Sequence, residues 1–381
     1  KAALRTYVAE KQLDKAEEVM NTLEKVMAAD SEGAAKLTQL YISLGMELER
    51  TLNRLRQERK EEEAKKVLDG FELFLDRIMK RPDNTFNSLY WVAETFQSLG
   101  AGLDPGGTRT CPPDAKQYYE KAAVAYEKLL DQVEEKLEEI DKQLQPVEEK
   151  LKQIKDPEQK KVEEEKVQPI REEKNKQEMI RGSILLRLAK CSRRVGQYKE
   201  ALKWITFLLQ EKPMMIDGQV EGAYICQAWG AEDAKYYLYA IQGGLKAKGK
   251  DGKEFQLPIW GWGRLARTVQ RFMMDPRMES PERQADKQRM SNYFHEARYN
   301  LALCRFEYGK TLSGERRTNT LKQAEEDILI VHRLMPELGG PEWFSKYNDL
   351  VKRIQQTQGK SPTGLPAVKP APSTPNVSAK K

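Results

Sequence analysis

The sequence predicts an all-α fold, an irregular α-solenoid of helical hairpins that is interrupted by one long, charged helical hairpin. Three observations lead to this expectation. An apolar triplet with the spacing i, i+4, i+7 recurs along the chain, as expected where one helix face packs against its neighbours. Apolar residues follow a heptad pattern from Val133 to Ile154. Charged residues make up 33% of the 381 residues and the mean hydropathy is −0.75, which suits a thin helical array.

Each triplet consists of an alanine followed by two large side chains, so that the alanine allows a neighbouring helix to approach closely. In two copies a proline, Pro213 or Pro336, follows the alanine by 12 residues and closes the unit. The six copies are Ala16/Met20/Leu23, Ala64/Leu68/Phe71, Ala122/Tyr126/Leu129, Ala201/Ile205/Leu208, Ala234/Leu238/Ile241 and Ala324/Ile328/Val331.

The segment 182–213 is the most complete unit. Its first predicted helix carries Leu185, Leu188, Ala189 and Ser192 on one face, Gly196 interrupts it, and the triplet that begins at Ala201 marks a second helix. This order of small and large residues resembles the tetratricopeptide repeat, in which paired helices must stack on neighbours to bury their apolar faces.

The resemblance implies repeats over 1–130 and 182–242, and irregular and repeat-like hairpins over 258–340. Only the step from Ala201 to Ala234 fits the regular period of about 34 residues, so we expect an uneven solenoid. Repeats of this family bind proteins or peptides in the concave face, usually through polar positions on the first helices. By position, the candidate partner-binding residues are Arg187, Lys190 and Arg194.

The charged segment 131–181 predicts an antiparallel coiled-coil arm. Its first helix is expected to reach about Lys155, to turn at Asp156-Pro157, and to return as the first helix of the 182–213 unit. The segment holds 16 acidic and 12 basic residues, a net charge of −4, which leaves +10 for the rest of a chain whose total is +6. The arm either grips a partner, pairs with a second copy of the chain, or is a solvated hairpin without a partner.

The remaining segments are assigned from their composition. We expect a flexible basic loop over 243–257, a capping helix over 341–356 and a disordered Pro-rich tail over 357–381. No apolar run is long enough for a membrane span. Because the chain begins with Lys1, we expect its true start to be missing; a signal peptide stays open and the localisation is undetermined.

A second candidate site combines aromatic and basic residues. Trp260 and Trp262 precede Arg264, Arg267 and Arg271, and the lysines Lys246, Lys248, Lys250 and Lys253 lie just upstream. Such a cluster can hold an acidic peptide or a nucleic-acid strand. The alternative is that the tryptophans fill the core and the arginines are merely solvated. The near balance of 65 basic and 59 acidic residues disfavours nucleic acid as the partner.

No pattern of catalytic residues is present. The chain has two histidines and four scattered cysteines without a C-x-x-C pair, and it lacks the spacings of a nucleophile elbow or a metal site. Gly261 to Ala266 match the letters of a dinucleotide loop, but Pro258 and a Gly/Lys-rich segment stand where that motif needs a strand. We therefore predict no enzyme and no cofactor, but a protein–protein interaction scaffold. The alternative is a self-assembling structural protein whose arms pair between copies.

Overall fold

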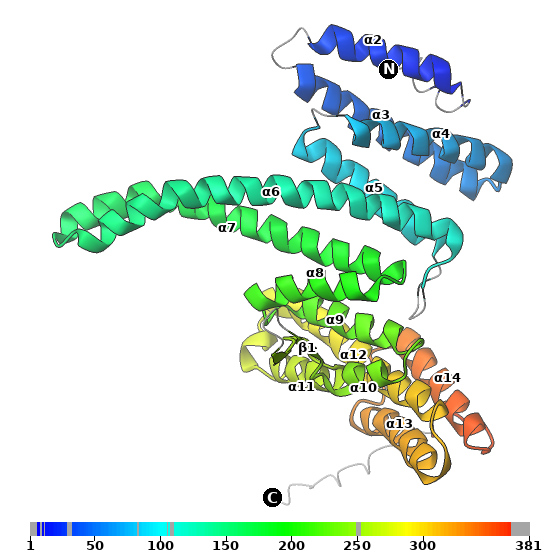
Figure 1. The fold of residues 1–381 in the computed structure, drawn as a ribbon. Coiled ribbons are helices and arrows are strands. Elements are labelled where there is room, and N and C mark those ends of the chain that lie inside the picture. The colour runs from blue at the N-terminus through cyan, green and yellow to red at the C-terminus, as the bar shows by residue number, and fades with distance from the viewer. Residues whose placement is uncertain are drawn as a thin grey trace, which may run out of the picture. The chain divides into compact units, whose positions relative to one another are not determined.

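The computed structural model describes residues 6–7, 10, 12–28, 33–81, 84–104, 106, 110–248 and 253–366. Over these residues the fold is all-α, as predicted, apart from two three-residue strands (Figure 1). The chain divides into two compact units, residues 1–197 and 198–381. The boundary falls inside the 182–213 motif, so its two predicted helices belong to different units.

Unit 1 is a series of helices in which most successive members pack against each other. Local signals set several of the helix starts: the Thr85 side chain accepts a hydrogen bond from the Ser88 amide, and Pro113 occupies the first turn of its helix. Gly196, with φ of +84°, follows the last helix in the left-handed region. The helices are α2 (Leu13–Ala28), α3 (Gly33–Gln57), α4 (Glu61–Lys80), α5 (Phe86–Leu103), α6 (Pro113–Gln153) and α7 (Pro157–Arg194).

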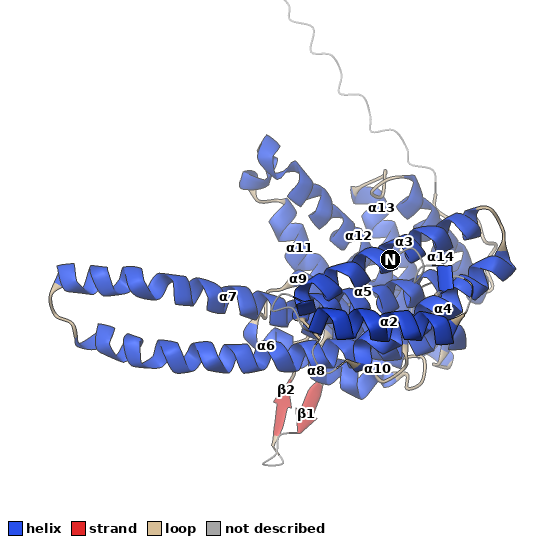
Figure 2. Cartoon of the chain, turned by 90° about the horizontal axis from the view of Figure 1, so that it is seen from above, coloured by secondary structure: helices blue, strands red, loops and turns tan. Residues whose placement is uncertain are grey.

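Helices α6 and α7 form an antiparallel hairpin whose distal half extends beyond α2–α5 (Figures 1 and 2). The turn lies where the sequence predicts it: α6 ends at Gln153, and the Asp156 carboxylate caps α7 by accepting from the Glu158 amide at 3.0 Å. Leu144, Leu151 and Val167 form a buried cluster between the two legs. Ion pairs also join the legs: Lys136–Glu173, Asp141–Lys174, Glu148–Arg171 and Glu134–Arg181.

Unit 2 holds the remaining helices and both strands. Helix α12 lies at its centre, since α10, α11, α13 and α14 all pack against it. The elements are α8 (Tyr198–Glu211), α9 (Ile216–Trp229), α10 (Lys235–Gln242), β1 (Lys246–Lys248), β2 (Glu254–Gln256), α11 (Trp262–Met273), the 3₁₀ turns η1 (Pro276–Glu279) and η2 (Pro281–Arg283), α12 (Gln284–Lys310), α13 (Gly314–Leu334) and α14 (Pro341–Thr357).

The predicted apolar triplets differ in how well they are buried. The copies that begin at Ala122, Ala201 and Ala324 are buried at all three positions. The copy at Ala234 is wrong in register: Ala234 is the N-cap of α10, and the helix buries Tyr237 and Ala240 instead. The ring of Tyr237 packs closely against Gly230, where an added Cβ would lie 2.5 Å from it.

The segment 243–257, predicted as a flexible loop, contains the antiparallel hairpin of β1 and β2 (Figure 2). Leu245 and Leu257 are buried at its base, and the Leu257 amide donates to the Leu245 carbonyl at 2.8 Å. Burial of these two leucines fixes both ends of a segment whose Lys- and Gly-rich composition favours a loop. Residues 249–252 lie outside the described residues.

The chain after α14 also departs from its prediction. The capping helix is present as α14, but residues 358–366, expected to be disordered, pack back along it. The Gly364 amide donates to Gln355 Oε1 and the Leu365 amide to Asn348 Oδ1, both at 2.9 Å. We call residues 358–366 the strap. Its two backbone amides thus donate to side-chain oxygens instead of to water. Residues 367–381 of the predicted tail lie outside the described residues.

Within the part of the chain that the structure describes, no helix combines the length and the apolar composition that crossing a bilayer requires.

Candidate functional site

Of the three candidate residues on α7, Arg187 is engaged in contacts within unit 1. Its guanidinium pairs with the Glu94 carboxylate of α5, and Nη2 donates to the Tyr90 hydroxyl at 3.0 Å. The buried Tyr126 hydroxyl donates to the same carboxylate at 2.6 Å, and burial raises the pKa of this phenol. Arg187 therefore ties α7 to α5.

Arg194 is also a structural residue. Its side chain is 8% exposed and that of Asp104 is 3% exposed, and the two form a two-pronged ion pair with Nε–Oδ2 and Nη2–Oδ1 distances of 2.6 and 2.5 Å. The Tyr119 hydroxyl and the Gly106 amide donate to the same carboxylate. The pair thus anchors the chain after α5 to the end of α7.

Lys190 is the only one of the three that is exposed. Arg187 and Arg194, the other two residues predicted as partner-binding candidates, each meet a carboxylate more than 80 residues earlier in the chain.

In unit 2, Trp262 is a core residue. It is fully buried, its indole Nε1 donates to Gln227 Oε1 at 2.7 Å, and the ring of Tyr224 meets it edge-on at 4.9 Å. Gln227 in turn donates to Asn300 Oδ1 at 3.0 Å, so that the buried polar groups are satisfied. Trp262 cannot contact a partner, and the core-filling alternative holds for it.

Trp260 lies at the boundary between the core and the surface. The residue is 5% exposed, and its backbone amide donates to Gln219 Oε1 at 2.7 Å. The guanidinium of Arg264 lies over its ring, 4.6 Å from the ring centre, which is a cation–π contact. The Trp260 ring thus supports the Arg264 guanidinium through this cation–π contact.

Helix α11 presents its arginines because its sequence separates two faces. Trp262, Leu265, Ala266 and Val269 are buried on one face, whereas the opposite face carries the arginines. The helix begins after Gly261, where a Cβ would lie 2.4 Å from the Gly243 backbone nitrogen. This close backbone approach explains why glycine stands in the motif that resembles a dinucleotide loop.

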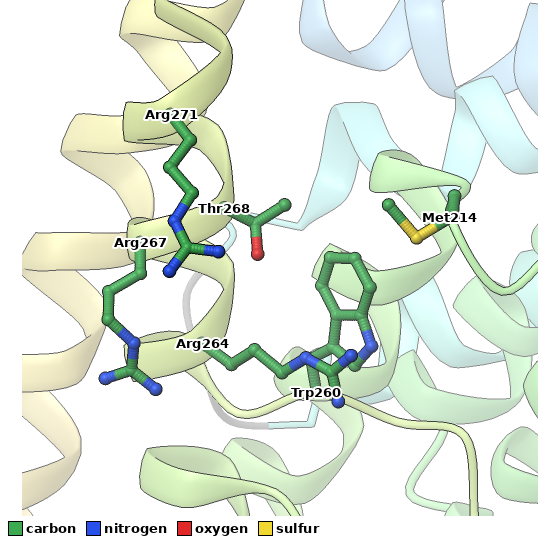
Figure 3. Close-up of a pocket in the computed structure, with 6 residues that line it drawn as sticks. All are labelled: Met214, Trp260, Arg264, Arg267, Thr268 and Arg271. Atoms are coloured by element: carbon green, nitrogen blue, oxygen red, sulfur yellow. The ribbon is translucent and has the colours of Figure 1, made fainter. Parts of the chain in front are cut away.

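The arginine face lines an open pocket of about 260 Å³, which we call the α11 pocket (Figure 3). Arg264, Arg267, Thr268 and Arg271 come from α11, Trp260 from the residues before it, and Met214 from the turn between α8 and α9. Figure 3 shows the side chain of Arg264 extending below the indole of Trp260, with Met214 on the far side of the opening.

The positive charge of the α11 pocket is not compensated. None of its lining residues is acidic, and within the described residues none of the three arginines forms an ion pair or a side-chain hydrogen bond. Other arginines of unit 2 do have carboxylate partners, as in Arg289–Asp217 and Arg353–Glu307. The pocket is therefore suited to binding an anionic group.

Of the lysines that the sequence places beside this cluster, none that the structure describes lines the α11 pocket. Lys246 pairs with Glu254 of the neighbouring strand at 3.5 Å, and Lys250 lies outside the described residues. Two lining residues were missed as candidates. Thr268 follows from its position one turn after Arg264, whereas Met214 comes from a turn about 50 residues earlier and gives no signal in the sequence.

The cysteines and the histidines are buried. All four cysteines are free and buried, and burial lowers the pKa of His295 to about 4. In the described residues no three His, Cys, Asp or Glu side chains cluster closely enough to hold a metal ion.

Comparison of the chain with protein-family models, curated proteins and solved structures gives no match.

Proposed function

We propose that this protein is a non-catalytic scaffold whose tetratricopeptide-like helical repeats bind a protein or peptide partner. The observation that carries the proposal is the α11 pocket, where three arginines without carboxylate partners surround an opening that Trp260 and Met214 also line. The described residues form many ion pairs elsewhere, whereas these three positive charges share one helix face and repel one another, which costs free energy. A partner that supplies the anions would remove that cost.

The architecture supports the same function. Helical hairpins that pack mainly on their neighbours form extended surfaces, as in the repeat solenoids that the sequence resembles. In this proposal the hairpin of α6 and α7 is an antiparallel coiled coil that provides a second contact surface.

The alternative, self-assembly through pairing of the arms, has less support. The apolar residues of the arm are used between its own two legs, and among the described residues 131–181 only Val162 and Met179 are large apolar side chains that are more than half exposed. Two arms would therefore have little apolar surface to bury against each other.

Affinity capture with defined variants tests the proposal. The full chain, a chain in which a short Gly-rich linker replaces residues 133–181, and the triple variant Arg264→Glu/Arg267→Glu/Arg271→Glu are immobilised in parallel. Arg316→Glu is the matched control, since Arg316 is an exposed arginine on α13 of the same unit. We expect a partner that the control retains and the triple variant loses.

Capture that is identical for the triple variant and the wild type would remove the basis of the proposal. Light scattering after size exclusion separates the alternative: a concentration-dependent dimer that disappears on deletion of 133–181 would establish self-assembly through the arm, and a monomer at high concentration would exclude it.

A further inference from the structure

The spacing of the arginines in the α11 pocket restricts what it can bind. Arg264 and Arg271 are seven residues apart, which corresponds to about 10 Å along a helix. An extended peptide covers the same distance in about three residues. Side chains of an extended segment alternate between two faces, so acidic residues two positions apart lie on the same face, about 7 Å from each other, and can pair with neighbouring arginines of this row.

The pocket is basic and also has an apolar wall. This wall is Met214, which is 57% exposed; Phe272 and Met274, at the C-terminal end of α11, are also exposed but do not line the pocket. A ligand made only of anionic groups would leave Met214 in water. A ligand that also carries an apolar side chain would cover Met214 and gain free energy from that burial.

The geometry disfavours a nucleic-acid strand. Binding of single strands relies on exposed aromatic rings on which bases stack. Among the described residues that line the pocket, Trp260 is the one aromatic side chain, and it is almost fully buried and covered by the guanidinium of Arg264. The stacked guanidinium instead keeps a planar fork of donors in place, and such a fork matches a carboxylate.

We propose that the α11 pocket binds a short acidic peptide segment that carries an apolar side chain. Its carboxylates pair with Arg264, Arg267 and Arg271, and its apolar side chain packs against Met214. This inference rests on the proposed function and names the chemistry of its partner. Because Arg264 is already held on Trp260, it loses less side-chain freedom on binding than a free arginine would.

Binding of defined peptides to the full chain tests the proposal by fluorescence anisotropy. The probe is a dye-labelled octapeptide with six Asp or Glu residues and two leucines. One matched peptide replaces the acids by Asn and Gln, a second replaces the leucines by serine, and a labelled oligothymidylate of equal charge serves as the nucleic-acid arm.

We expect saturable binding of the acidic peptide, which the double variant Arg267→Glu/Arg271→Glu weakens by about tenfold or more, while Arg316→Glu changes it less than about twofold. Met214→Ser and the serine peptide should each weaken binding several-fold. Circular dichroism checks that each variant is folded, and all of the substituted side chains are exposed.

Several results would overturn the proposal. The first is an absence of saturable binding below about 1 mM, and the second is binding of the acidic peptide by the double variant as tight as by the wild type. The third is equal affinity for the serine peptide and the leucine peptide, which would indicate an anion site without an apolar subsite. The fourth is tighter binding of oligothymidylate than of the acidic peptide, with the same dependence on the arginines. The capture experiment tests the proposed function separately. If the peptide does not bind but a captured protein still requires the α11 arginines, the scaffold stands with another ligand chemistry.

Discussion

The ion pair of Asp104 and Arg194 gives the sharpest stability prediction. Asp104→Ala removes an acceptor that receives two hydrogen bonds from the Arg194 guanidinium, one from the Tyr119 hydroxyl and one from the Gly106 amide. The arginine is then left 8% exposed without this carboxylate. The perturbation therefore removes the carboxylate that neutralises a buried guanidinium, which is more than the loss of one contact.

The expected loss in the free energy of unfolding of unit 1 is about 3–5 kcal/mol, the usual cost of removing one partner from a buried ion pair. A single neutral hydrogen bond would account for only about 1 kcal/mol. The double variant Asp104→Ala/Arg194→Met removes both charges and fills part of the space with an apolar side chain. It should therefore cost clearly less than the sum of the two single variants.

Hydrogen exchange at increasing urea, followed by mass spectrometry on peptides from α5, α6 and α7, reports on unit 1 separately from unit 2. Arg316→Ala is the control and should change stability by less than about 0.5 kcal/mol. A loss below about 1 kcal/mol for Asp104→Ala, or a double variant that costs the full sum, would refute the reasoning.

Three further predictions concern other parts of the chain. His295, buried with a pKa lowered from 6.5 to about 4, binds fewer protons in the folded state, so stability should fall as the pH drops from 6.5 to 4, by about 3 kcal/mol in full; His295→Leu should remove this part of the slope in urea titrations at several pH values, and an unchanged slope would count against it. The four buried cysteines, among them Cys226 with a pKa raised by burial to about 12, should react with a thiol reagent at pH 8 only after denaturation, and rapid labelling of the native chain would contradict their burial. Val167→Ala should destabilise the distal arm by about 1–2 kcal/mol and speed amide exchange near Leu144 and Leu151 but not in α4; uniform exchange changes would show that the arm does not open on its own.

Sequence reasoning succeeded where a periodic pattern runs for several turns. The heptads before Asp156 predicted the first leg of the hairpin, because buried contacts between long helices repeat at fixed spacing, and Asp156-Pro157 predicted its turn. It failed where one or two distant contacts decide the local structure. Leu245 and Leu257 fix a hairpin in a segment of loop-like composition, and Gln355 and Asn348 hold a strap that was expected to be disordered.

The same limit applied to the candidate sites. Arg187 and Arg194 were predicted as partner-binding candidates from the repeat resemblance, yet the carboxylates that neutralise them lie on or just after α5, and no local pattern connects the two segments. The arginines of α11, which the sequence places at helical spacing, line one pocket, because their spacing along one helix is local. Whether a charged side chain is paired depends on the fold, and this separates the two groups.

The hairpin of α6 and α7 has a consequence for how this protein can vary. The distal apolar contacts of the arm are made between its own two legs, so its length is independent of the packing in the rest of unit 1. Adding seven residues to each leg would preserve the register of the apolar contacts between the legs and lengthen the hairpin by about 10 Å. The length of the hairpin can therefore change in steps of seven residues per leg, while the other helices of unit 1 are unchanged.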